Sequence, residues 1–363
     1  MTTIVRVDLG ARGYDVVVGA GILADAGKRI VPVLNEARVI VVSDHNVAPI
    51  YLPILRDTLA VAGIKVKAMT VAPGETSKTF SALDQLTGKI LATNIERCTT
   101  LVALGGGVVG DLTGFSASIL LRGIGFINVP TTLLAQVDSS IGGKTGINTT
   151  QGKNLVGNFH QPRLVLTDVN ALNTLPQREL LAGYAEMVKT SLIADSDFFS
   201  WLEDNGEALL AGDRDARIHA IARCCRIKAD IVAADECEAG RRGLLNLGHT
   251  FAHALEAEAG YSSTLVHGEA VAIGLCMAFD LSHRLGTCSA EDAVRVRAHL
   301  ERVGLPTRPT GSVDAAQRLL DYIGLDKKVK DGRPTFVLAR GIGDAFLTQD
   351  APPAEVAAII TAA

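Results

Sequence analysis

The chain has 363 residues, of which 48% are hydrophobic and 20% are charged, and its formal net charge is −4. This composition supports a hydrophobic core and excludes an intrinsically disordered chain. The slight negative charge gives no support to a nucleic-acid-binding protein, because such proteins carry a basic surface.

The N-terminal half alternates segments typical of strands with segments typical of helices. A hairpin is predicted at residues 4–9 and 14–18, and helices are predicted at residues 46–60 and 80–92. Short buried strands rich in Val, Leu and Ile are predicted at residues 38–43, 65–71, 100–104, 126–129 and 164–167. This alternation predicts a parallel sheet with helices on both faces.

The pattern becomes helical near residue 176. Helices are predicted at residues 191–201, 213–233, 248–259, 268–285 and 291–302, and the only strand is predicted at residues 335–339. We therefore predict the α/β class, with a parallel-sheet domain at residues 1–176 and a mostly helical domain at residues 177–363.

Cysteine usage and the N-terminal segment indicate the compartment. None of the six cysteines belongs to a CxxC pair, so we expect free thiols in a reducing environment. The first residues lack the basic start and apolar stretch of a secretory signal, and no segment reaches the length of a membrane span. We expect a cytoplasmic protein with neither a nucleic-acid nor a membrane partner.

A glycine-rich turn follows the strand predicted at residues 100–104. Gly105, Gly107 and Gly110 fit the GxGxxG spacing, which can hold the pyrophosphate of a dinucleotide at a helix N-terminus. The turn does not follow the first strand, and no acidic residue lies about 20 positions later, so a standard dehydrogenase domain is not indicated. Residues 140–145 (SIGGKT) resemble the end of a P-loop, but Asp138 occupies the position of its first glycine.

Three segments carry residues of the kinds that bind metal ions. Glu186 and Lys189 share one face of a helix, and so do His249 and His253; His267 lies in a third segment. Two or three histidines with a carboxylate suit Zn²⁺ and leave a position open for substrate. Spacing alone suggests that His249 and His253 both bind metal, whereas the alternative is that these histidines only form hydrogen bonds with their neighbours.

Six basic residues lie near the glycine turns or the metal-type segments. Each alone would more often be a solvated charge, but together they suggest a pocket for an anionic substrate, since Lys and Arg bind phosphate and carboxylate groups. They are Arg122, Lys144, Lys153, Lys189, Lys228 and Arg242.

Several motifs resemble those of the 3-dehydroquinate synthase family. Residues 104–111 (LGGGVVGD) are similar to the family's nucleotide loop, and residues 130–148 (PTTLLAQVDSSIGGKTGIN) are the most specific match. Residues 152–157 (GKNLVG), 246–253 (NLGHTFAH) and 267–270 (HGEA) follow in the same order as in the family. The resemblance covers nearly the whole chain.

The resemblance implies a first domain that binds NAD and a second domain that binds metal and substrate. The implied ligands of Zn²⁺ or Co²⁺ are Glu186, His249 and His267. Contrary to the spacing argument, His253 is implied to transfer protons. The implied NAD contacts are Asp44, Asn46, Glu75, Lys78, Gly106, Gly107, Asp111, Thr131, Thr132, Asp138, Lys144, Lys153, Ala171, Leu172, Asn173 and Thr174.

The substrate contacts implied by the resemblance are mostly charged or amide side chains. They are Arg122, Asp138, Lys144, Asn154, Lys189, Lys228, Arg242, Asn246, His253 and one of Lys327 and Lys328. The implied catalytic residues are His253, Lys144, Asp138, Lys189, Lys228 and Asn246.

The implied reaction converts 3-deoxy-D-arabino-heptulosonate 7-phosphate to 3-dehydroquinate and phosphate, the second step of the shikimate pathway. A transient NAD-dependent oxidation, with the metal as Lewis acid, makes phosphate elimination feasible; re-reduction and an intramolecular aldol closure follow. The enzyme would be a carbon–oxygen lyase acting on phosphates, and the family implies a homodimer.

Three other functions compete with this interpretation. Another sugar phosphate cyclase would differ at substrate contacts such as Asn246 and His253. A metal-dependent alcohol dehydrogenase would leave the Asp138–Lys144 and Lys153–Asn154 segments unexplained. A binding protein that has lost activity is disfavoured, because no motif residue is missing.

Overall fold

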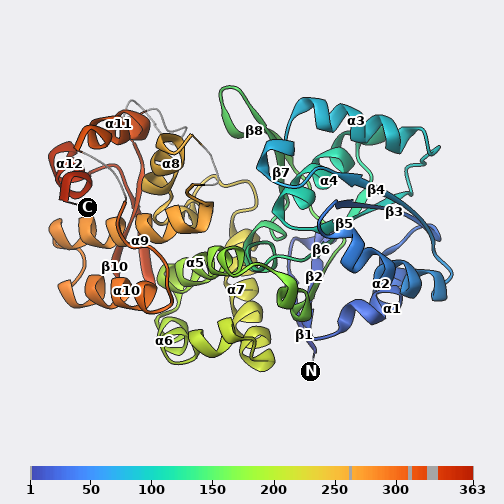
Figure 1. Ribbon diagram of the computed structural model, residues 1–363, viewed down its shortest axis with the longest axis horizontal. Helices are drawn as coiled ribbons and strands as arrows, with labels where there is room; N and C mark the ends of the chain where they lie inside the picture. The colour runs from blue at the N-terminus through green and yellow to red at the C-terminus, as the bar shows by residue number, and fades with distance from the viewer. Residues whose placement is uncertain (1, 261–263, 310–312, 325–333, 363) are drawn as a thin grey trace. The chain divides into compact units, whose positions relative to one another are not determined.

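The computed structural model describes residues 2–260, 264–309, 313–324 and 334–362 (Figure 1). The chain forms two compact units, and neither is a single continuous stretch. The first comprises Met1–Leu175 and Arg214–Cys237, and the second comprises Pro176–Asp213 and Glu238–Ala363. Within the described residues, no helix has both the length and the apolar character needed to cross a bilayer. All six cysteines are free thiols, as expected.

The first unit contains a seven-stranded sheet in the order β1-β2-β9-β6-β5-β3-β4. The opening hairpin β1–β2 is antiparallel, and the other pairs are parallel. The predicted hairpin and the five predicted strands are therefore confirmed. Their bounds are β1 (Thr2–Val7), β2 (Tyr14–Gly19), β3 (Arg38–Asp44), β4 (Lys65–Val71), β5 (Thr100–Gly105), β6 (Gly125–Pro130) and β9 (Leu164–Asp168).

Helices cover both faces of this sheet, because side chains alternate along each strand. Val39 and Val41 of β3 pack in one core cluster with Leu55 and Leu59, while the intervening Ile40 belongs to the cluster on the other face. The helices involved are α1 (Ala26–Ile30), α2 (Ala48–Val61), α3 (Phe80–Leu91) and α4 (Gly107–Ile119).

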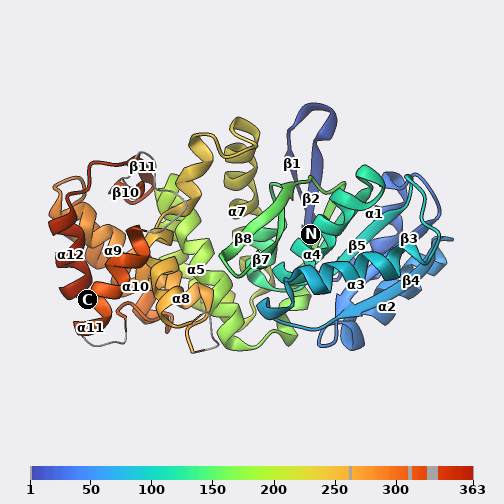
Figure 2. The same ribbon diagram turned by 90° about the horizontal axis from the view of Figure 1, so that it is seen from above.

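Helix α7 (Arg214–Ala234) belongs to the first unit, where it packs against β1 and β2 (Figure 2). The two continuous domains predicted from the sequence, with a boundary at residue 176, place this helix in the second unit instead. Its apolar residues, such as Ile221 and Val232, are fully buried. Helical periodicity in the sequence shows that the apolar face of this helix must be covered, but it does not show which part of the chain covers it.

An antiparallel hairpin of β7 (Lys144–Thr149) and β8 (Gly152–Phe159) carries several motif residues. These two strands were not predicted from the sequence, because β8 is largely exposed and lacks the apolar run of a buried strand.

Lys78 fixes this hairpin to α4. Its side chain is 3% exposed, and its Nζ donates to Asp111 Oδ2 at 2.6 Å and to Asn154 Oδ1 at 2.5 Å. Asn148 adds a second link, because its side chain donates to Glu75 Oε1 at 2.8 Å and accepts from the Asn154 N–H at 3.0 Å. Burial lowers the pKa of Lys78, but Asp111 and Glu75 raise it by more, so the ammonium stays charged.

The second unit is mostly helical. Its helices are α5 (Gln177–Ala194), α6 (Ser196–Ala211), α8 (His249–Glu258), α9 (His267–Arg284), α10 (Ala290–Arg302), α11 (Val313–Gly324) and α12 (Pro353–Ala362). The single helix predicted at residues 191–201 is wrong, because α5 ends before Asp195. The Asp195 side chain accepts a hydrogen bond from the Phe198 N–H at 2.9 Å and caps α6.

The prediction of only one strand in the second half is also wrong. β10 (Phe336–Gly341) pairs with β11 (Asp344–Thr348) in an antiparallel hairpin. Its turn contains Gly343 at φ 88°, a conformation that favours glycine. β11 has five residues, too few to give a clear alternation in the sequence.

Replacing Lys78 with Met is expected to lower the free energy of unfolding by about 3–5 kcal/mol, because the substitution leaves the partly buried Asp111 carboxylate without its cation. Urea denaturation followed by circular dichroism measures the change. The matched control is Lys28→Met, since Lys28 pairs with Asp25 at the surface, where the side chains are 83% and 56% exposed, and no measurable change is expected. An unchanged midpoint for Lys78→Met would contradict the anchoring role.

Candidate active-site residues

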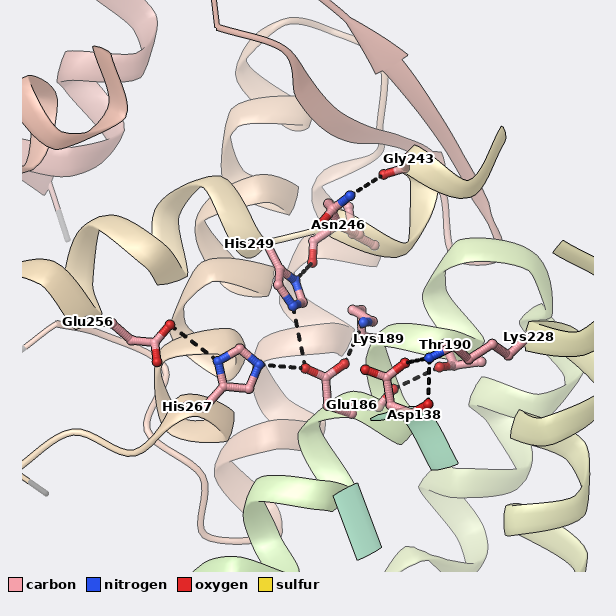
Figure 3. Close-up of polar contacts among 11 residues, drawn as sticks. Asp138, Glu186, Lys189, Thr190, Lys228, Gly243, Asn246, His249, Glu256 and His267 are labelled. Carbon is pink, nitrogen blue, oxygen red and sulfur yellow. Dashed lines mark hydrogen bonds and ion pairs between the residues drawn. The ribbon is translucent and has the colours of Figure 1, made fainter. Parts of the chain in front are cut away.

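A carboxylate and two imidazoles converge in the second unit (Figure 3). Glu186 lies on α5, His249 begins α8 and His267 begins α9. Glu186 Oε1 is 3.1 Å from His267 Nε2 and 3.5 Å from His249 Nε2. The donor atoms of these three residues all lie within 4.8 Å of one another, and this group does not include His253. The arrangement supports the ligand set implied by the family resemblance over the set suggested by the spacing of His249 and His253.

Close helix packing brings these three residues together. A Cβ atom on Gly268 would collide with the backbone of Ala182 in α5, and a Cβ atom on Gly274 would collide with the backbone of Gly248, which precedes α8. Both glycines lie in α9, where the absence of a side chain allows neighbouring backbones to approach. The first turn of α9 can therefore lie against α5, and the start of α8 can lie against the middle of α9.

Each imidazole ring has a second polar contact on the side away from Glu186. His249 Nδ1 lies 3.2 Å from the Leu247 carbonyl, and His267 Nδ1 lies 3.2 Å from Glu256 Oε2. Both partners are acceptors, so each Nδ1 donates, and each Nε2 turns toward Glu186. Glu256 was not among the predicted site residues. The sequence does contain a signal for Glu256, because this residue lies about two turns after His249 on the same side of α8.

The cluster is strongly charged although Glu186 and Lys189 are almost completely buried. These two side chains form an ion pair, with the Lys189 Nζ 2.5 Å from Glu186 Oε2. Burial raises the pKa of Glu186, but Lys189 and His267 together lower it to about 2. Burial lowers the pKa of His267, but Glu186 and Glu256 raise it to about 10. His267 therefore holds a proton that a divalent cation would replace, and three converging donors of this kind fit such an ion.

Other predicted residues of the second unit lie in the turn before α8. The Arg242 side chain is buried, and Asn246 Nδ2 donates to Glu238 Oε1 and to the Gly243 carbonyl, both at 3.1 Å. Glu238 is not among the residues predicted from the sequence. It adopts φ 59°, which is rare for a non-glycine residue, and backbone conformation of this kind leaves no signal in the sequence. Lys327 and Lys328 lie outside the described residues.

In the first unit, Asp138 and Lys228 form a close ion pair. Asp138 lies in a π-helical turn at Ala135–Ser139 and Lys228 lies on α7; the Lys228 ammonium also donates to the Asp138 carbonyl at 2.6 Å. The return of α7 to this unit therefore brings together two residues implied to be catalytic. Arg122 and Lys144 are exposed on separate elements of the same unit.

Most implied NAD contacts follow adjacent strands of the parallel sheet. Asp44 ends β3, Gly106 and Gly107 follow β5, Thr131 and Thr132 follow β6, and the turn at residues 171–174 follows β9. Ligands of open parallel sheets bind at this carboxyl edge. Cβ atoms on Gly106 and Gly107 would collide with Thr132 and Ser139. Glycine at both positions therefore allows the backbone of the turn to pack close to these two side chains. The P-loop alternative fails here, because residues 142–143 lead into strand β7 and not into a helix.

Two family models cover most of the chain. The model described as 3-dehydroquinate synthase N-terminal matches residues 68–182, and the model described as 3-dehydroquinate synthase C-terminal matches residues 183–329. A 3-dehydroquinate synthase from Rhodospirillum rubrum is 57% identical and covers 100% of this chain and 95% of its own length. One from Caulobacter vibrioides is 54% identical and covers 99% of this chain and 98% of its own length.

Solved structures of sugar phosphate cyclases share the fold. A 2-epi-5-epi-valiolone synthase from Streptomyces hygroscopicus subsp. jinggangensis, with NAD⁺ and Zn²⁺ bound, is 29% identical with a TM-score of 0.88 and covers 96% of each chain. A 2-deoxy-scyllo-inosose synthase complexed with carbaglucose-6-phosphate, NAD⁺ and Co²⁺ is 26% identical with a TM-score of 0.89, covering 99% of this chain and 100% of its own. An iron-containing alcohol dehydrogenase, 14% identical with a TM-score of 0.66, shares the fold alone. On the evidence of the two family models and the full-length relatives, the chain belongs to the 3-dehydroquinate synthase family.

Proposed function

We propose that this chain converts 3-deoxy-D-arabino-heptulosonate 7-phosphate to 3-dehydroquinate and phosphate, as a carbon–oxygen lyase that uses NAD and a divalent metal ion. The observation that carries the proposal is the convergence of Glu186, His249 and His267 in a chain of this family. The homodimer and the cytoplasmic location stay predictions.

The second unit would hold the metal ion through Glu186, His249 and His267, whose donor atoms already converge. The relatives with bound Zn²⁺ or Co²⁺ support these two ions. When bound, the ion would supply Lewis acidity toward the oxygen attached to the substrate carbon that loses and regains a hydride. Lys189 keeps Glu186 ionised, as the lowered pKa of that carboxyl shows, and so maintains an anionic ligand.

NAD would lie at the carboxyl edge of the sheet in the first unit, with its pyrophosphate at the glycine turn before α4. The proposed substrate contacts of this unit are Arg122, Asp138, Lys144, Asn154 and Lys228, and those of the second unit are Lys189, Arg242, Asn246 and His253. Their cations suit the phosphate and carboxylate of the substrate. His253 would carry a proton to and from a substrate oxygen.

Zn²⁺ binding to the metal-free protein is expected to strengthen with pH. His267 has a pKa of about 10, so below this pH each ion must displace one proton, and the apparent Kd should fall about tenfold per pH unit between about pH 6.5 and 8.5. Competition with a chelating dye measures Kd, and Glu186→Gln should raise it by at least about 100-fold. An affinity independent of pH would contradict the displacement of this proton.

His253→Ala is expected to keep the metal content of the unmodified protein while turnover falls by about 10²–10⁴-fold, the usual scale for acid–base catalysis. Elemental analysis and phosphate release measure the two quantities on the same sample. His249→Ala serves as the comparison and should lose the metal. Loss of metal from His253→Ala would instead indicate that both histidines of α8 are ligands.

The cofactor should act catalytically, because the oxidised carbon must be reduced again before product forms. One equivalent of NAD⁺ should support many turnovers of phosphate release, and NADH absorbance should never exceed one enzyme equivalent. Absorbance and phosphate are followed in one reaction, with the product identified by mass. Stoichiometric NADH without phosphate release would overturn the proposal in favour of a dehydrogenase.

A further inference from the structure

Glu256 makes a contact that the proposed chemistry has not used. Its side chain is 4% exposed, and its Oε2 accepts the Nδ1–H of His267 at 3.2 Å. Figure 3 shows the His267 ring between this carboxylate and Glu186, with one ring nitrogen directed at each. The ring therefore cannot turn without breaking both contacts.

A carboxylate at this place is costly for folding. Glu256 is buried, and it lies in the last turn of α8 (His249–Glu258), where the helix dipole disfavours negative charge. The nearby Glu258 resolves the same problem differently, because its side chain is 26% exposed and pairs with Arg318 at 2.6 Å. A buried, hydrogen-bonded carboxylate on the far side of an imidazole is the arrangement that orients histidine ligands of metal ions.

A second carboxylate near His267 has a different role. Glu269 Oε2 accepts the Val266 N–H at 3.1 Å, and Arg178 binds both Glu269 oxygens at 2.6 and 2.7 Å. These bonds fix the backbone at the start of α9 but do not involve the imidazole ring. Of Glu256 and Glu269, only Glu256 contacts the ring.

We infer that Glu256 is a positioning residue that fixes the ring orientation and the Nδ1–H tautomer of His267, so that Nε2 is presented to the metal ion. Helix α8 then supplies one ligand, His249, and the residue that orients another. This inference rests on the proposed metal site, but it adds a determinant of metal affinity outside the ligand set.

The test compares Glu256→Gln and Glu256→Leu with Glu258→Gln, a matched change on the same helix at a partly exposed site. Kd for Co²⁺ is measured on the metal-free full-length chain by chelator competition, and circular dichroism checks folding. Both Glu256 variants should raise Kd by about 10- to 100-fold, with the larger effect for Leu, which cannot accept the Nδ1–H bond. Glu258→Gln should leave Kd unchanged.

A spectroscopic measurement separates ring orientation from a general loss of stability. In zinc-loaded, ¹⁵N-histidine-labelled protein, His267 (assigned from His267→Gln) should show a protonated Nδ1 and a metal-bound Nε2, and Glu256→Leu should lose this pattern. Equal Kd values for Glu256→Gln, Glu256→Leu and the unmodified chain, or coordination through Nδ1, would overturn the inference while leaving the proposed function intact. An unmodified chain that binds no Co²⁺ would instead overturn the proposed metal site itself.

Discussion

The close approach of α9 to α5 and to the start of α8 is the constraint on which the second unit depends. Gly268 and Gly274 leave no room for a Cβ atom against Ala182 and Gly248. The absence of a Cβ atom at both positions lets these backbones approach, so Glu186 in the middle of α5 meets the side chains of His249 and His267 at the starts of α8 and α9. The glycines thus convert three separate motifs into one cluster, and the histidines at the first positions of α8 and α9 are placed by backbone packing before any hydrogen bond orients them.

Charge balance explains how this cluster tolerates burial. Without an ion, the carboxylates of Glu186 and Glu256 are matched by the ammonium of Lys189 and the protonated imidazole of His267, so the four groups together are neutral. A divalent cation that displaces the His267 proton would give the four groups and the ion together a net charge of one positive unit. A cluster of that charge favours an anionic substrate and a developing negative oxygen, so a bound metal ion would also change the electrostatic character of the unit.

The parts of this structure that were predictable from sequence are those with a local cause. Runs of Val, Leu and Ile identified the strands, and the glycine spacing placed a turn between β5 and α4. The return of α7 to the first unit depends on which surface covers its apolar face, and no local pattern encodes that choice. The same holds for the exposed hairpin β7–β8 and for Glu238, whose position follows from an unusual backbone conformation. The family resemblance supplied the candidate ligands, but Glu256 needed a structure, because its role depends on a residue of another helix.

Lys78 illustrates how a structure restricts an implied role. An ammonium group donates three hydrogen bonds, and around the Lys78 Nζ lie Asp111 at 2.6 Å, Asn154 at 2.5 Å and Glu75 at 3.4 Å. A contact between Lys78 and a nucleotide would therefore have to replace one of these acceptors. The weakest is Glu75, whose Oε1 also accepts from Asn148. If a nucleotide replaced Glu75 as an acceptor, Lys78 would still join α4 to the β7–β8 hairpin. If it replaced Asn154, the hairpin would lose its bond to Lys78. Because Glu75 is the most distant of the three acceptors, the distances favour a nucleotide contact that leaves the hairpin in place.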